Sequence, residues 1–193
     1  MLSLKQKLIG NMMKFVDKII VAQPNWCVPA VLEMVLRHYG ILDYTQFSIA
    51  EQLNIVPASD DIVSTKWGAQ ISDNTLNDFF VNNCIKLQEK FRSIHLYMDE
   101  DFFADEIKLL LAKDITIVCG YSYTWLFGNR EDSFGHVSII VGVSDDLQNI
   151  YLLDPGPKNA GYKSVSAHDL FYAIKARNDG LWCIQKQQAT SSC

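Results

Sequence analysis

The chain has 193 residues, of which 49% are hydrophobic and 20% are charged, and its formal net charge is −5. This composition excludes an intrinsically disordered chain, and the acidic balance without a basic stripe argues against nucleic acid as the main partner. The length fits one domain over residues 1–193, with room for a sizeable core.

At the N-terminus, apolar residues recur between charged ones, and we expect a helix over residues 3–20 within an N-terminal segment 1–22. Lys5, Lys7 and Lys14 interrupt the apolar run, so the segment predicts neither a signal peptide nor a transmembrane span. The helix is expected to pack on the domain, with a membrane-surface or partner-docking helix as the alternative. The default location is cytoplasmic, and an injected bacterial effector without a cleavable signal is the second interpretation.

The next segment, from Gln23 to Gly40, predicts a loop that brings a cysteine to the start of a buried helix. Pro29 is tolerated only in a first helical turn, so the helix should begin near Cys27 and run to residue 39. Apolar residues follow at spacings of three and four, and Gly40 is suited to end the helix in a left-handed conformation. The partial positive charge of a helix N-terminus favours the thiolate of Cys27, which is its nucleophilic form.

After this helix the chain continues with short helices and then mostly with strands. Short helices are expected over 48–53, capped by Ser48, and over 75–81, capped by Asp73 or Asn74, with a loop at 56–72 between them. The later elements are expected as strand 93–98, helix 99–111, strand 115–120, aromatic loop 121–135, strand 136–143, strand 149–153, helix 166–176 and strand 181–185. This order indicates an α+β fold, with the cysteine helix packed against an antiparallel sheet and a loose tail at 187–193.

The five cysteines are widely spaced, and no two of them form a CxxC pair. A structural zinc site and a disulfide framework are therefore not expected, and no metal or cofactor is implied. Cys84, Cys119 and Cys183 are expected to be buried as small apolar side chains, and Cys193 to lie in the tail.

Two polar residues in the second half are candidates for partners of Cys27. Gly135 and His136 open the most apolar strand, and Asp154 ends the next one. If the two strands form a hairpin around a turn at 145–146, Asp154 falls within one residue of the position that faces His136. The carboxylate could then fix the imidazole through one ring nitrogen and leave the other nitrogen to take a proton from Cys27. Each residue alone could also have a purely structural role: Cys27 as a buried cysteine, His136 as a packed histidine and Asp154 as a turn residue.

Together these motifs resemble the papain-like clan of cysteine peptidases, and most closely the bacteriocin-processing (double-glycine leader) peptidase family and its relatives. The resemblance rests on Gln-x₃-Cys-x-Pro-Ala before an apolar helix, Gly-His opening a Val/Ile strand, and Leu-Leu-Asp-Pro-Gly, and it covers residues 23–186. It implies a papain-like fold in which Cys27 is the nucleophile, His136 the base and Asp154 the residue that orients the base. Gln23 is then the oxyanion donor.

The chain also departs from the family pattern. Val28 follows the cysteine where the family commonly has glycine, and Gln23 lies four residues before Cys27 rather than five or six. The backbone N–H of Cys27 and the side chain of Asn25 are therefore alternative oxyanion donors. Trp26 and Trp125 are expected beside the substrate, although the aromatic loop that holds Trp125 could equally form a packed satellite cluster.

The expected activity is cleavage of a peptide or amide bond in a peptide or protein substrate through an acyl-enzyme on Cys27. The same triad would support glutamine deamidation, as in papain-like bacterial effectors, or amide-forming acyl transfer. A third hypothesis is an inactive peptide-binding module that keeps the fold, motivated by Val28 and the displaced Gln23. The sequence does not predict the oligomeric state.

Overall fold

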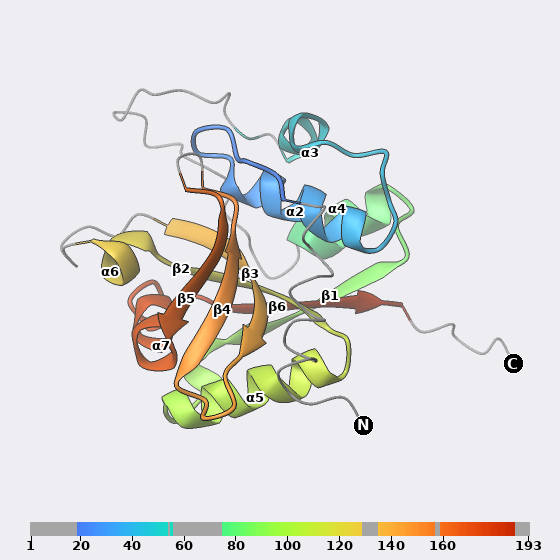
Figure 1. Cartoon of the computed structure of the whole chain (residues 1–193). Helices are drawn as coiled ribbons and strands as arrows, with labels where there is room; N and C mark the ends of the chain where they lie inside the picture. Colours follow the sequence, from blue (N-terminus) through green and yellow to red (C-terminus); the bar gives the residue numbers. More distant parts are fainter. Residues whose placement is uncertain (1–18, 54, 56–74, 129–134, 157–158, 188–193) are drawn as a thin grey trace, which may run out of the picture.

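The computed structural model of the protein describes residues 19–53, 55, 75–128, 135–156 and 159–187. Helices lie on both faces of a central antiparallel sheet, so the predicted α+β class is confirmed (Figure 1). No described helix is both long enough and apolar enough to cross a membrane.

The sheet has the strand order β1-β6-β2-β3-β4-β5, and every neighbouring pair is antiparallel. Its strands are β1 (Leu87–Ser93), β2 (Thr116–Ser122), β3 (Gly135–Val143), β4 (Asn149–Asp154), β5 (Gly161–Ser166) and β6 (Gly180–Lys186). The central strands β2 and β3 are rich in Val and Ile because both of their faces are covered. The edge strands β1 and β5 carry more polar side chains, as exposed edges usually do.

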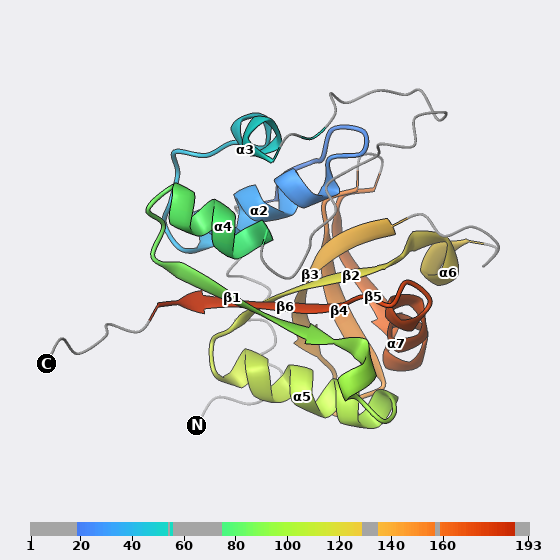
Figure 2. The same cartoon turned by 180° about the vertical axis from the view of Figure 1, so that it is seen from behind.

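Two helices, α2 (Cys27–His38) and α4 (Thr75–Asn82), cover one face of the sheet, and α3 (Gln46–Gln52) packs on α2 on the side away from the sheet (Figures 1 and 2). The helix α2 begins at Cys27 as predicted, and Gly40 after it has a φ of +82°, the left-handed conformation expected at a helix end. Thr45 caps α3 by accepting from the backbone N–H of Ser48, and Ser48 returns the contact. The prediction that Ser48 is the cap was therefore wrong by three residues.

The opposite face is covered by α5 (Glu100–Ala112), α6 (Tyr123–Phe127) and α7 (Ala167–Lys175), with the short 3-10 helix η2 (Ile94–Leu96) beside them. Asp99 and Ser166 cap α5 and α7 through their side chains, which explains where these helices start.

Each face of the sheet has its own hydrophobic core. Val31 and Val35 of α2 pack with Val137 and Ile139 of β3 in one core. Ile107 of α5 belongs to the other core, which α7 completes. The sheet is therefore the shared middle layer, and α2 is fixed to it along its apolar side (Figure 2).

The β3–β4 hairpin contains a β-bulge at Val141 that changes its register. Val143 pairs with Ile150 on the turn side of the bulge, whereas Ile140 pairs with Leu152 beyond it. One more step past Ile139 and its partner Leu153 places Asp154 opposite Ser138, two residues from His136. The predicted register put Asp154 within one residue of the position that faces His136, so it was wrong by one residue.

This bulge decides on which face Asp154 lies. Without the extra residue, the pairing near the turn would continue and put Asp154 opposite Ile139, on the face away from His136. With it, Asp154 is opposite Ser138, which shares a face with His136 because side chains alternate along a strand. The bulge therefore brings the two polar residues to the same side of the sheet.

Most of the other predicted elements are confirmed within a few residues, and the errors fall at edges and loops. Residues 93–98 are the end of β1 followed by η2, not a strand, and β1, β5 and α6 were not predicted. The predicted N-terminal helix and the loop at 56–72 fall outside the described residues, except that Ile19 and Ile20 are not helical. Of the tail at 187–193, the structure describes Gln187, which is exposed. Cys84 is exposed, contrary to the prediction, whereas Cys119 and Cys183 are buried as expected.

Candidate active site

Cys27 is the first residue of α2, and the loop before it is held by backbone hydrogen bonds. Trp26 N–H donates to the carbonyl of Gln23 at 2.9 Å, which forms the turn that leads into the helix. Ala22 N–H donates to the carbonyl of Pro155 at 2.8 Å. The segment that carries Cys27 is therefore tied directly to the segment that follows Asp154.

His136 lies near the start of β3, and its ring has contacts on both nitrogens. Its Nε2 is 2.8 Å from Asp154 Oδ1, and its side chain also forms a hydrogen bond with the thiol of Cys27. Because Nε2 faces the carboxylate, Nδ1 is the ring nitrogen available to Cys27. The imidazole is half-buried, with 11% of its side chain exposed.

The carboxylate of Asp154 is completely buried and has three polar neighbours. Oδ1 accepts from His136 and from the backbone N–H of Gly156, the latter at 2.7 Å. Oδ2 forms an ion pair with the ammonium of Lys163, which reaches it from β5. A buried carboxylate needs such partners, and these three hold it in one orientation.

The environment shifts the Cys27–His136 pair toward its charged form. Burial raises the pKa of the Cys27 thiol, but the hydrogen bond and charge of His136, with smaller contributions from Val137 and Val28, lower it below its ordinary value. Burial lowers the pKa of His136, but its contacts with Asp154 and Cys27 outweigh this effect and raise it to about 9. These opposite shifts favour the thiolate–imidazolium pair over the neutral thiol–imidazole pair.

Asp154 stays ionised for the same reasons. Burial raises the pKa of its carboxyl, but the hydrogen bond and charge of His136, the ammonium of Lys163 and the N–H of Gly156 together bring it below its ordinary value. An ionised carboxylate can only accept hydrogen bonds, so it fixes the proton of the neutral imidazole on Nε2.

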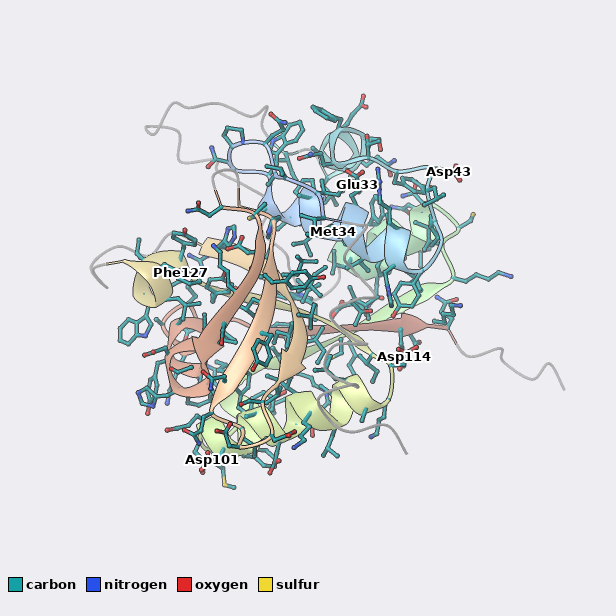
Figure 3. The ribbon with its side chains drawn as sticks, viewed as in Figure 1. Glu33, Met34, Asp43, Asp101, Asp114 and Phe127 are labelled. Atoms are coloured by element: carbon teal, nitrogen blue, oxygen red, sulfur yellow. The ribbon has the colours of Figure 1, made fainter. Side chains whose placement is uncertain are left out.

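Aromatic rings enclose the imidazole on the side of α6. Tyr121 and Tyr123 meet the ring of His136 edge-on, with centroids 5.6 and 5.3 Å away. Phe127, labelled on α6 in Figure 3, continues this wall and contacts both tyrosines. Trp125 packs against the core beneath α6, so the residues of the predicted aromatic loop that contact His136 are Tyr121 and Tyr123.

The other predicted site residues, Gln23, Asn25 and Trp26, lie in the loop before Cys27. Gln23 is half-buried, and Asn25 has a positive φ of 65°, as the turn requires. Trp26 is buried and packs edge-on against Phe47, with centroids 5.4 Å apart. Their assignment as oxyanion or substrate-binding residues remains a prediction.

A buried polar network from α2 and α3 supports this loop. Gln46 Oε1 accepts from the backbone N–H of Gln23, and Gln46 Nε2 donates to the carbonyl of Val21, both at 3.0 Å. Glu33, labelled on α2 in Figure 3, accepts from the backbone N–H of Gln46 and from Arg37, both at 2.6 Å. Gln46 and Glu33 were not found from the sequence, because their positions in helical faces resemble those of ordinary surface residues.

Two glycines of the motifs have packing reasons. A Cβ on Gly135 would meet the guanidinium carbon of Arg177 at 2.7 Å, so a side chain before His136 would require the end of the Arg177 side chain to shift. A Cβ on Gly156 would lie 3.0 Å from Asp154 Oδ1, where its backbone N–H now donates. Each glycine therefore leaves room for a neighbouring side chain, Arg177 at Gly135 and Asp154 at Gly156.

The remaining histidines lie elsewhere. His38 is at the far end of α2, and His95 and His168 are exposed, the latter paired with Glu100 at 3.1 Å. In the described part of the chain, no three His, Cys, Asp or Glu side chains are grouped so that they could hold a metal ion.

Comparisons with known proteins identify the family and the fold. The model of the Peptidase C39-like family matches residues 12–189. The crystal structure of a protein from Bacillus anthracis, named as a C39-like peptidase, has a TM-score of 0.61 to this structure at 10% sequence identity. The match covers 90% of this chain and 98% of that one, which shows the same fold. No curated protein sequence matches the chain.

Proposed function

This chain belongs to the Peptidase C39-like family, and we propose that Cys27, His136 and Asp154 form a catalytic triad that cleaves a peptide bond. Family and fold support a function of the cysteine peptidase type. The observation that carries the triad is the 2.8 Å contact between His136 Nε2 and buried Asp154, with Cys27 on the opposite side of the imidazole at a helix N-terminus.

In the first half of the reaction, the thiolate of Cys27 attacks the carbonyl carbon of the scissile bond and forms a tetrahedral intermediate. Backbone N–H groups at the start of α2 point toward the helix N-terminus, where the oxyanion would develop, and the side chain of Gln23 or Asn25 would add a donor. The imidazolium of His136 then gives its Nδ1 proton to the leaving amine, the C–N bond breaks, and a thioester remains on Cys27.

In the second half, neutral His136 removes a proton from a water molecule, which attacks the thioester. The C–S bond breaks, the acid product leaves, and the thiolate–imidazolium pair is restored. Throughout, Asp154 holds the Nε2 proton and the ring orientation without being protonated itself.

The proposal is tested by incubating the protein with a library of peptides and reading new termini by mass spectrometry. We expect the wild type to produce new termini, Cys27→Ala to produce none, and Cys84→Ala to match the wild type, because Cys84 is an exposed cysteine in the turn that follows α4. Cleavage that persists in Cys27→Ala would contradict the proposal.

The same spectra separate the other hypotheses for this site. Conversion of glutamine side chains to glutamate would indicate deamidation, and coupling of a peptide to an added amine would indicate acyl transfer. Peptide binding without any turnover, together with ordinary reactivity of Cys27, would indicate a binding module.

A further inference from the structure

We propose that Lys163 is a positioning residue of the active site, which fixes the Asp154 carboxylate and sets the charge balance of the Cys27–His136 pair. This inference rests on the proposed triad and adds a fourth member to it. Lys163 touches none of the atoms that would react, so its effect passes through Asp154.

The first argument is the way Asp154 divides its contacts. Oδ1 faces His136 and the N–H of Gly156, whereas the ion pair with Lys163 is formed by Oδ2. Each carboxylate oxygen therefore has a separate task. An ammonium on Oδ2 prevents the carboxylate from rotating away from the imidazole.

The second argument is the placement of Lys163 in the sheet. Lys163 pairs with Leu152 in the β4–β5 ladder, and Asp154 pairs with Gly161, so the two charged residues are diagonal neighbours on the same face. The side chain of Lys163 reaches from the edge strand toward the Asp154 carboxylate, which has no exposed surface. Of the Lys163 side chain itself, 18% remains exposed. A lysine on an edge strand would ordinarily extend into water, so this inward path is a specific feature.

The third argument is that aromatic rings hold the ammonium in place. Lys163 Nζ lies 4.7 Å from the ring centroid of Phe127 and 5.8 Å from that of Tyr123. Tyr123 also contacts the imidazole of His136, so α6 packs against both the ammonium of Lys163 and the imidazole. Cation–π contact of this kind compensates the ammonium for part of its lost hydration.

The electrostatic consequence has a definite sign. A positive charge lowers the pKa of every neighbouring group, so loss of the charge on Lys163 must raise the pKa of Asp154, His136 and Cys27 together. Among the residues that the structure describes, the titratable or charged groups along this row are Cys27 (α2), Cys119 and Tyr121 (β2), Tyr123 (α6), His136 (β3), Asp154 (β4) and Lys163 (β5).

The experiment measures two midpoints that need no substrate. One is the pH midpoint for alkylation of Cys27 by iodoacetamide, and the other is the NMR titration midpoint of the His136 ring, assigned with His136→Ala. In Lys163→Met we expect both midpoints to move to higher pH by about 0.5 to 1 unit, less than the roughly 1–3 units caused by a charge in direct contact. Lys163→Arg should keep both midpoints close to those of the wild type.

Lys175 provides the matched control. It is exposed on α7 and lies over two aromatic rings, Phe171 at 5.6 Å and Tyr172 at 5.8 Å, so Lys175→Met removes the same charge from a similar setting. We expect it to leave both midpoints unchanged. Circular dichroism checks folding, and Lys163→Gln removes the same charge with a polar side chain if the methionine variant does not fold.

The outcomes separate this inference from the proposed function. If the wild type shows a low midpoint for Cys27 and Lys163→Met or Lys163→Gln leaves both midpoints in place, the role of Lys163 is wrong and the triad stands. A shift of equal size in Lys175→Met would also overturn the specific role. If Cys27 of the wild type reacts as an ordinary thiol and His136→Ala changes nothing, the triad itself fails.

Discussion

His136 Nε2 and Asp154 Oδ1 lie 2.8 Å apart although the two residues do not face each other in the β3–β4 ladder. They are diagonal neighbours on one face, a spacing that an imidazole can bridge. The diagonal leaves the second carboxylate oxygen of Asp154 on the side of β5, where Lys163 meets it. The resulting row of charges runs across the sheet from Lys163 to Cys27, and each prediction below removes one part of it or of its support.

Removing His136 should remove the unusual reactivity of Cys27. In the wild type, the contact with His136 lowers the pKa of Cys27 and so increases the fraction of thiolate at pH values below its ordinary pKa. In His136→Ala, burial is left as the largest influence and raises that pKa. We expect alkylation of Cys27 at pH 6 to fall about tenfold or more, because a shift of one unit changes the thiolate fraction tenfold.

Mass spectrometry of the alkylated peptides measures this rate, and the exposed Cys84 of the same molecule serves as the reference. Its rate should be equal in the two proteins. A Cys27 rate that is also equal in both would show that His136 does not activate the thiol.

Hydrolysis and alkylation should respond differently to alkaline pH. The pKa of His136 is raised to about 9, so the imidazolium that protonates the leaving amine is lost as pH rises through that value. Alkylation by iodoacetamide requires only the thiolate and should stay fast above pH 9. We therefore expect peptide cleavage to fall about tenfold per unit above pH 9 while the alkylation rate remains on its plateau.

The pH profiles of peptide cleavage and of Cys27 alkylation are measured on one preparation between pH 5 and about 10.5. This range covers the ordinary pKa values of cysteine and histidine side chains. If cleavage and alkylation declined together at alkaline pH, the decline would indicate unfolding rather than proton loss from His136. A circular dichroism scan over the same range identifies that case.

Neutralising Asp154 should destabilise the fold through Lys163. Asp154→Asn leaves the ammonium next to a neutral amide, and we expect the free energy of unfolding at pH 7 to fall by roughly 2–4 kcal/mol. This is somewhat below the roughly 3–5 kcal/mol of a fully buried pair, because 18% of the Lys163 side chain is exposed. Urea unfolding measures the loss, and adding Lys163→Met to Asp154→Asn should recover part of it.

The same comparison has a pH signature. The folded-state pKa of Asp154 lies below its ordinary 3.8, so its contribution to stability is present above that value and is lost as pH falls through the folded-state pKa. The difference between wild type and Asp154→Asn should therefore shrink in acid. A difference that stays constant below pH 3.8 would contradict the ion-pair explanation.

The loop before Cys27 should depend on Gln46. Gln46→Ala removes the acceptor of Gln23 N–H and the donor to Val21, and we expect a stability loss of roughly 1–3 kcal/mol. Peptide cleavage should fall about tenfold because the loop carries the candidate oxyanion donors. The pH midpoint of Cys27 alkylation should not move, since His136 and Asp154 are untouched.

Thermal unfolding and cleavage assays measure these effects, with Glu51→Ala as the control because Glu51 is exposed on the same helix. Cleavage equal to that of the wild type in Gln46→Ala would show that the loop keeps its position without this side chain.

Local signals in the sequence predicted most of the fold correctly. The proline in the first turn and the glycine after the last turn defined α2, and runs of Val and Ile defined β2 and β3. The edge strands β1 and β5 were not predicted because polar side chains on an exposed edge hide the apolar alternation. The order Cys27, His136, Asp154 was likewise readable, because each residue stands at a recognisable element boundary.

The sequence by itself therefore determined most of the element types, the fold class and the three residues of the proposed triad. Only the tertiary structure decided how they meet. The bulge at Val141 sets the face on which Asp154 lies. Lys163 and Gln46 reach the site from β5 and α3, and such contacts between distant segments leave no periodic signal in the chain because they depend on side-chain direction in the folded state.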